Sequence, residues 1–195
     1  MKKFVLGLTG GIASGKSVAA ELLRKKGAHI VDADLISREV VADACIIAKI
    51  SEAFPESVEN GAINRKKLRE TVFSSPEKTK RLNSITHPEI IKRCLLRTAE
   101  TDGVVVLVAP LMFETGLNAA CDAVATVSCD TDTRIKRIVK RDNTDVDTAK
   151  NIIERQLSDD EREKLADYVV DNNGSVYELN QKIEQLVGKL GLFEQ

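Results

Sequence analysis

One segment near the amino end constrains this chain more than any other. Residues 7–23 read GLTGGIASGKSVAAELL, where four glycines, a lysine and two serines stand between two apolar runs. An ordered glycine costs backbone entropy, so this crowding indicates an unusual backbone path or a ligand that approaches the backbone closely. Residues 10–17 match the pattern G-x-x-x-x-G-K-[S/T] without a mismatch, after a predicted strand and before a predicted helix. The segment therefore predicts a phosphate-binding loop.

The residue types of this loop fit the tail of a nucleoside triphosphate. Inward-turned backbone N–H groups cradle phosphate oxygens, and the following helix points its positive end at the same anion. Lys16 is expected along the β- and γ-phosphates, and the Ser17 hydroxyl is expected to ligate Mg²⁺. ATP with magnesium is thus the predicted ligand. The nucleotide-binding residues expected from the loop are Gly11, Ile12, Ala13, Ser14, Gly15, Lys16, Ser17 and Val18.

Five short apolar runs predict an α/β fold with a five-stranded parallel sheet. They are nearly continuous rather than alternating, as in strands buried on both faces. They cover residues 4–8, 29–32, 104–108, 123–128 and 168–171. Stretches with a helical apolar spacing, such as 17–26 and 175–190, separate them. This alternation is typical of a sheet flanked by helices.

The alternation is interrupted between residues 34 and 102, where the sequence predicts helices and no strand. The expected helices are 35–54, stopped by Pro55; 65–73, capped by Asn64; one that opens at Pro76 and that Pro88 ends or kinks; and a fourth to about residue 100. A connection of this length far exceeds a normal crossover, which indicates a functional insert. A second strand-poor stretch, 131–167, is dense in charge.

Composition excludes some function classes. With 29 basic and 30 acidic side chains the net charge is −1, so nothing favours a nucleic-acid or membrane surface. No apolar run approaches the length of a membrane span or a signal segment, and we expect a cytoplasmic protein without an obligate protein partner. The cysteines Cys45, Cys94, Cys121 and Cys129 lack C-x-x-C spacing and are expected to be reduced thiols.

Two carboxylates follow the second predicted strand, in VDAD at residues 31–34. Ligands of open parallel sheets lie beyond the carboxyl ends of the strands, so Asp32 and Asp34 are expected near the phosphate-binding loop. A carboxylate there can accept the proton of an attacking hydroxyl, and Asp34 is the candidate catalytic base. The alternative is that Asp34 caps the helix that follows.

The motifs occur in an order that resembles the dephospho-coenzyme A kinase family. LTGGIASGKS is followed by VDAD, LRETVFSSPEKTKRLNSITHPEI, PLMFETGL and ADYVVDNNGS, over residues 5–175. The resemblance implies transfer of the ATP γ-phosphate to the ribose 3′-hydroxyl of dephospho-coenzyme A. It also implies a nucleotide-binding core of residues 1–34, 103–141 and 166–195, a helical acceptor-binding domain of residues 35–102, and a lid of residues 142–165.

The resemblance also implies roles for single residues. Asp34 resembles the family's catalytic aspartate, Thr9 the threonine beside the loop, and Arg141 the arginine that meets the transferring phosphate, so the expected catalytic residues are Asp34, Lys16 and Arg141. The neighbouring cations Arg134, Lys136, Arg137 and Lys140 are alternatives to Arg141.

Other positions are expected at the periphery or depart from the family pattern. Asp32, His87, Glu114 and Arg137 are peripheral candidates, although His87 also fits a turn or core residue and Glu114 a helix start. Ala13 replaces a common glycine and Val18 a common threonine. The acid often found at position 108 is valine here, so water is expected to complete the magnesium shell.

Two other functions compete with this one. Another kinase of similar size, acting on a nucleoside or sugar acid, shares the phosphate-binding loop. A nucleotide-switched binding protein shares it as well, but the chain lacks an N-K-x-D guanine reader and carries a long insert suited to an acceptor.

Overall fold

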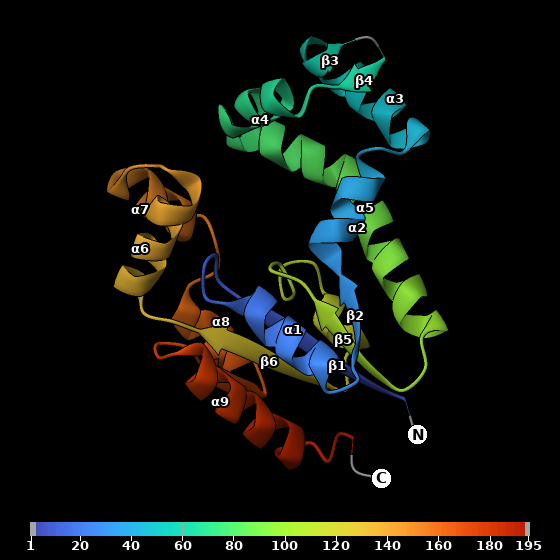
Figure 1. Ribbon diagram of the computed structural model, residues 1–195. Helices are drawn as coiled ribbons and strands as arrows, with labels where there is room; N and C mark the ends of the chain where they lie inside the picture. Colours follow the sequence, from blue (N-terminus) through green and yellow to red (C-terminus); the bar gives the residue numbers. More distant parts are fainter. Residues whose placement is uncertain (1–2, 60, 194–195) are drawn as a thin grey trace. The chain divides into compact units, whose positions relative to one another are not determined.

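The computed structural model describes residues 3–59 and 61–193, and the chain divides into two compact units. The first, which we call the core unit, consists of Met1–Val31 and Arg97–Gln195. The second, the helical unit, consists of Asp32–Leu96. Figure 1 shows the elements of both.

The predicted five-stranded parallel sheet is confirmed. Its strands are β1 (Phe4–Gly10), β2 (His29–Asp32), β5 (Val104–Val108), β6 (Ala123–Ser128) and β7 (Tyr168–Asp171), in the spatial order β2-β5-β1-β6-β7. Strand β1 lies at the centre, paired in parallel with β5 and with β6. Central parallel strands are buried on both faces, which explains their continuous apolar sequences.

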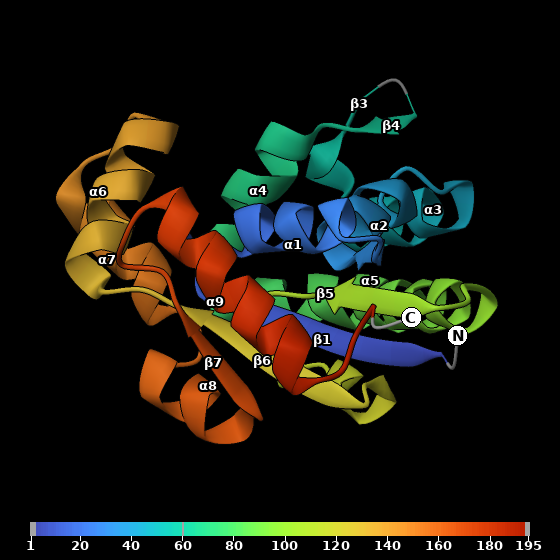
Figure 2. The ribbon, with the colours of Figure 1, turned by 60° about the horizontal axis from the view of Figure 1, so that its bottom comes forward.

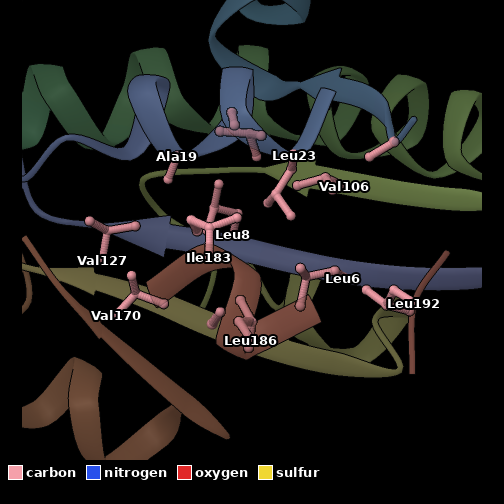
Figure 3. Close-up of a cluster of buried hydrophobic side chains, with 14 of the residues drawn as sticks. Leu6, Leu8, Ala19, Leu23, Val106, Val127, Val170, Ile183, Leu186 and Leu192 are labelled. Atoms are coloured by element: carbon pink, nitrogen blue, oxygen red, sulfur yellow. The ribbon is translucent and has the colours of Figure 1, made fainter. Parts of the chain in front are cut away.

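Helices α1 (Lys16–Lys25) and α9 (Val176–Lys189) cover one face of this sheet (Figure 2). Leu6 and Leu8 of β1 are fully buried against Leu23 of α1 and Ile183 of α9 (Figure 3). Each such side chain contributes roughly 1.5–3 kcal/mol by leaving water. This core fixes β1 and α1, and therefore the ends of the loop between them.

Three further helices belong to the core unit: α6 (Thr131–Asp142), α7 (Val146–Glu154) and α8 (Asp159–Leu165). A second, smaller apolar cluster holds α6 and α7 together through Ile135, Ile138 and Ala149. Ile12 and Ala13 pack against the same cluster. The phosphate-binding loop is therefore attached to α6 and α7 by apolar contact as well as by the polar contacts described below.

The helical unit contains α2 (Ala33–Val40), α3 (Ala44–Ala53), a short 3₁₀ turn (Pro55–Ser57), α4 (Arg65–Phe73) and most of α5 (Pro76–Glu100). Asn64 caps α4 as expected, because its side chain accepts hydrogen bonds from the amides of Lys66 and Lys67.

Three sequence-based expectations for the helical unit are wrong. The helix predicted over 35–54 is two helices, since Asp43 caps a new one by accepting from the amide of Cys45. The third and fourth predicted helices are one helix, because α5 continues through Pro88 and does not end there. A two-stranded hairpin, β3 (Val58–Glu59) and β4 (Ala62–Ile63), occurs where no strand was expected.

No helix within residues 3–59 and 61–193 combines the length and the apolar character that crossing a bilayer requires.

Candidate active site

The phosphate-binding loop has a backbone that glycine permits. Strand β1 ends at Gly10 with φ +151°, and Gly15 caps α1 with φ +100°. Ala13 also has a positive φ, +61°, in the left-handed region that costs a non-glycine residue about 1–2 kcal/mol. A glycine would adopt this conformation without that cost, whereas Ala13 packs in it against the apolar cluster of α6 and α7.

Two arginines of α6 hold carbonyl groups of the loop. Arg134, which is 2% exposed, donates from Nε to the carbonyl of Ile12 at 2.9 Å. Arg137 donates from Nη1 to the carbonyl of Ala13 at 3.1 Å. The two lie three residues apart, so they share one face of the helix. The carbonyls of this loop therefore face α6 and a positive charge.

The loop that follows β7 holds the next carbonyl. Asn172 donates from Nδ2 to the carbonyl of Ser14 at 2.7 Å, and Asn172 itself is 7% exposed. A Cβ added to Gly15 would lie 2.0 Å from the same Nδ2 atom. Close approach of Asn172 therefore requires a glycine at position 15.

The backbone amides where the loop meets α1 are left available. The carbonyl of Gly11 accepts from the amide of Ser14, and the carbonyl of Gly15 accepts from the amide of Val18, so the carbonyls of residues 11–15 all have donors. In the described part of the chain, the amides of Gly15, Lys16 and Ser17 donate to no acceptor. Because buried or crowded amides are rarely left unpaired, this arrangement suits an anion at the start of α1.

A buried ion cluster fixes Arg134 in place. Asp159, at the start of α8, forms ion pairs with both Arg134 and Arg162, and the two guanidinium groups are almost fully buried. Burial lowers the pKa of the Arg162 guanidinium, and the nearby carboxylates of Asp159 and Glu114 oppose this shift. Removing one partner of a buried ion pair destabilises a protein by about 3–5 kcal/mol, because the other charge stays buried without compensation. The cluster links α6 and α8 beneath the loop.

Lys16 and Ser17 occupy the first turn of α1. Lys16 is half-buried and Ser17 is exposed, and neither side chain forms an ion pair or hydrogen bond among residues 3–59 and 61–193. The hydroxyl of Ser14 is buried without a partner in this region, which is the kind of group that a ligand or water satisfies. An uncompensated lysine beside free amides fits a polyphosphate.

The residues present fit a magnesium ion that is held mainly by phosphate and water. The described residues contain no group of three or more acidic, histidine or cysteine side chains placed to bind a metal. Ser17 supplies one hard oxygen ligand, and Mg²⁺ commonly takes few protein ligands together with substrate phosphates. When bound there, the ion would neutralise charge on the phosphate oxygens.

Thr9 and Glu114 lie on the carboxyl side of the central strands. Thr9 is fully buried, and its hydroxyl donates to the carbonyl of Pro110 at 3.5 Å, which connects β1 to the turn after β5. Glu114 lies exposed in that turn and starts no helix, so the helix-start alternative is wrong.

Val18 of α1 follows Ser17 directly, and its side chain is 40% exposed.

Arg141 lies on the same face of α6 as Arg134, seven residues further along and thus about 10 Å away along the axis. Its guanidinium binds both carboxylate oxygens of Asp142, at 2.7 and 2.8 Å, and remains 57% exposed. This contact raises the pKa of Arg141. Arg134 and Arg137 therefore contact the loop, and Arg141 does not.

In the helical unit, the structure distinguishes the two aspartates of VDAD. Asp32 is the N-cap of α2, because its carboxylate accepts from the amides of Asp34 and Leu35 at 2.8 and 3.3 Å. The alternative that Asp34 is the cap is wrong. Asp34 lies in the first turn, exposed, and its carboxylate has no partner among the described residues. It remains available for other chemistry.

His87 is half-buried inside α5, directly before Pro88. Burial lowers its pKa, which favours the neutral imidazole. The turn alternative is wrong, because α5 is continuous here.

Sequence reasoning missed two contacts of the loop. Gln156 accepts from the amide of Ile12 through Oε1 at 2.8 Å, and Asn172 holds the carbonyl of Ser14. Their distance along the chain hid them, since only the fold brings residues 156 and 172 to residues 12 and 14. The spacing of Arg134, Arg137 and Arg141 was a usable signal, because residues 0, 3 and 7 share a helix face.

Comparisons with known proteins identify the family of this chain. A family model described as dephospho-CoA kinase matches residues 4–178. A dephospho-CoA kinase of Fusobacterium nucleatum is 39% identical over 95% of this chain and 97% of its own length. One of Bacillus licheniformis is 41% identical over 94% of each chain.

Solved structures share the fold. One from Thermus thermophilus has a TM-score of 0.85 at 28% identity and covers 97% of this chain and 99% of its own. A dephospho-CoA kinase from Campylobacter jejuni has a TM-score of 0.64 at 24% identity over 96% of this chain and 97% of its own. The family model and the two relatives match most of the length of this chain, and the free amides at the start of α1 suit the anion that a kinase binds. This chain therefore belongs to the dephospho-CoA kinase family.

Proposed function

We propose that this chain transfers the γ-phosphate of ATP to the ribose 3′-hydroxyl of dephospho-coenzyme A, which yields coenzyme A and ADP. The family match over residues 4–178 carries the proposal, and the free amides of residues 15–17 beside Lys16 support the nucleotide half. Both substrates are small molecules, and we place the reaction in the cytoplasm.

The phosphate-binding loop holds the β- and γ-phosphates through its amides, and Lys16 lies along them as a positive charge. Ser17 would ligate Mg²⁺, and the ion would supply positive charge beside the phosphate oxygens. Arg134, Arg137 and Asn172 act on the loop's carbonyl side, where they keep the amides turned toward the nucleotide. Such fixed donors stabilise charge without reorganising during the reaction.

Asp34 receives the proton. The acceptor's 3′-oxygen forms a bond to the γ-phosphorus, the bond from that phosphorus to the β–γ bridging oxygen breaks, and ADP leaves. The 3′-hydroxyl proton passes to the Asp34 carboxylate, which is exposed and unpaired within the described residues. Asp32 stabilises the start of α2 as its N-cap.

Arg141 contacts the transferring phosphoryl group. Arg134 and Arg137 are already committed to loop carbonyls, and Arg141 is the further arginine on their helix face. It must exchange its surface pair with Asp142 for the phosphate, which is inexpensive because exposed ion pairs are worth about 0–1 kcal/mol.

ADP release tests this proposal against other acceptors. Purified protein is incubated with ATP, magnesium and one of dephospho-coenzyme A, shikimate, gluconate or a nucleoside. Rapid release with dephospho-coenzyme A alone is expected, and it should vanish in Lys16→Ala but persist in Lys25→Ala, on the last turn of the same helix. Release with a different acceptor only would refute the proposal.

A further inference from the structure

The helical unit contains a cavity of about 350 Å³ at the junction of α2, α4 and α5. Its apolar surface comes from Val41, Leu68, Val72 and Leu82. Polar groups of Ser37, Thr79 and Asn83 and the arginines Arg38 and Arg69 complete the lining. A mostly apolar cavity with a few polar groups is the usual form of a small-molecule site, and its volume lies within the usual range.

The charged residues that line this cavity favour a ligand with an anionic group. Both of its charged lining residues are arginines, and no acidic residue lines it. Arg38 is exposed, and its guanidinium forms no ion pair or hydrogen bond with any described residue. An apolar cavity beside an uncompensated cation suits a ligand with an anionic group attached to an apolar chain.

Helix α2 relates this cavity to Asp34. Ser37, Arg38 and Val41 follow Asp34 by three, four and seven residues, so all four share one face of α2. Arg38 lies one turn from Asp34, about 6 Å along the axis. A ribose whose 3′-hydroxyl meets Asp34 therefore has its 5′-substituents within reach of Arg38.

We propose that the cavity holds the pantetheine arm of the acceptor and that Arg38 binds the 5′-diphosphate that joins this arm to the ribose. The inference rests on the proposed function, because it takes the acceptor from there. The arm's branched apolar carbons fit against Leu68, Val72 and Leu82, and its amides meet the polar rim. Arg38 and the cavity thus make the enzyme specific for an acceptor that carries this arm.

Steady-state kinetics with three variants test the site. Arg38→Ala removes the diphosphate contact, Arg38→Lys restores a charge, and Ser37→Trp fills the cavity. Arg24→Ala is the matched control, an exposed arginine in the last turn of α1 as Arg38 is in the last turn of α2. 4′-Phosphopantetheine, which is the arm without adenosine, serves as an inhibitor.

In the wild type we expect 4′-phosphopantetheine to compete with dephospho-coenzyme A and not with ATP. Arg38→Ala and Ser37→Trp should raise the KM for dephospho-coenzyme A about 10-fold or more and weaken this inhibition equally, with the KM for ATP within two-fold. Arg38→Lys should recover part of the loss, and Arg24→Ala should match the wild type.

Different results would overturn the two proposals separately. If the wild type transfers no phosphate to dephospho-coenzyme A, the proposed function fails and this inference with it. If the wild type is active but both variants keep its KM within two-fold, the pantetheine site alone is wrong. Circular dichroism of each variant excludes misfolding as the cause of a loss.

Discussion

Replacing Gly15 by alanine tests how the phosphate-binding loop is held. The new Cβ would lie 2.0 Å from Nδ2 of Asn172, and the residue would keep φ near +100°. Asn172 must then swing away, which breaks its 2.7 Å hydrogen bond to the carbonyl of Ser14. The change acts on the backbone and on its carbonyl partner together.

The cost has two parts and one offset. A left-handed alanine costs about 1–2 kcal/mol. The loss of the Asn172 contact leaves a nearly buried amide and a carbonyl unpaired, at about 1–3 kcal/mol. Alanine restricts the unfolded chain relative to glycine, which returns about 0.4–1 kcal/mol. We expect Gly15→Ala to lower the free energy of unfolding by about 2–4 kcal/mol.

Urea titration followed by circular dichroism measures this free energy. Gly188→Ala is the control, since Gly188 lies inside α9 with no atom within 4 Å of a new Cβ and no strained φ. That variant should be more stable by about 0.5–1 kcal/mol. Each single variant, Gly15→Ala and Asn172→Ala, loses some free energy of unfolding. The double variant should lose less than the sum of these two losses, by at least 1 kcal/mol, because the new Cβ no longer meets the Asn172 side chain.

A Gly15→Ala protein as stable as the wild type would refute this description of the loop. Strict additivity with Asn172→Ala would refute the contact between residues 15 and 172.

The remaining predictions concern single side chains. Asp34→Asn should lower kcat by about 10²–10⁴-fold with little change in urea midpoint, whereas Asp32→Ala should cost about 1 kcal/mol of stability by the same titration; equal stability losses would contradict the separate roles. Arg141→Ala should lower kcat more than it raises the KM for ATP, while Arg137→Ala should raise that KM and reduce stability, and identical kinetic profiles would contradict this division. Burial lowers the pKa of His87, so as the pH falls below about 6.5 the histidine takes up a proton in the unfolded chain before it does so in the folded protein, and the stability of the wild type decreases. In urea titrations at pH 7.5 and 5.5, His87→Gln should show a smaller decrease in stability than the wild type. An equal decrease in the two proteins would contradict this role of His87.

The parallel sheet could be predicted because each strand carries its own signal. Residues 104–108 are all buried, and a strand buried on both faces needs a continuous apolar run. The helices at 16–25 and 176–189 were equally predictable from their apolar spacing, and the structure adds a capping box of Ser175 and Glu178 at the start of the second.

The helical unit was harder to predict because its breaks depend on tertiary contacts. Asp43 begins a new helix, and its carboxylate is held by Arg93, fifty residues away. Pro88 costs α5 one backbone hydrogen bond, but the buried residues Thr86 and Cys94 on either side stabilise the helix through packing. The sequence also carried a hairpin signal, because Asn-Gly, the pair of letters at positions 60 and 61, is the dipeptide that most favours two-residue hairpin turns.

At the site, the sequence predicts which groups would bind phosphate, but not the groups that hold the loop in place. Lys16 and Ser17 have fixed places in a contiguous motif, so spacing alone finds them. Arg134 and Asn172 reach the loop from α6 and from the segment after β7, and only the strand order places those segments beside β1. Contacts of that kind depend on topology, which the local pattern does not contain.

The position of the transferred phosphate decides whether this chain phosphorylates the ribose 3′-hydroxyl of dephospho-coenzyme A. Protein, ATP, magnesium and dephospho-coenzyme A are incubated, and the product is examined by mass spectrometry and by phosphorus–proton correlation NMR. We expect one added phosphate, coupled to the ribose 3′ proton. A product phosphorylated at another hydroxyl, or an acceptor recovered unchanged while ATP is consumed, would contradict it.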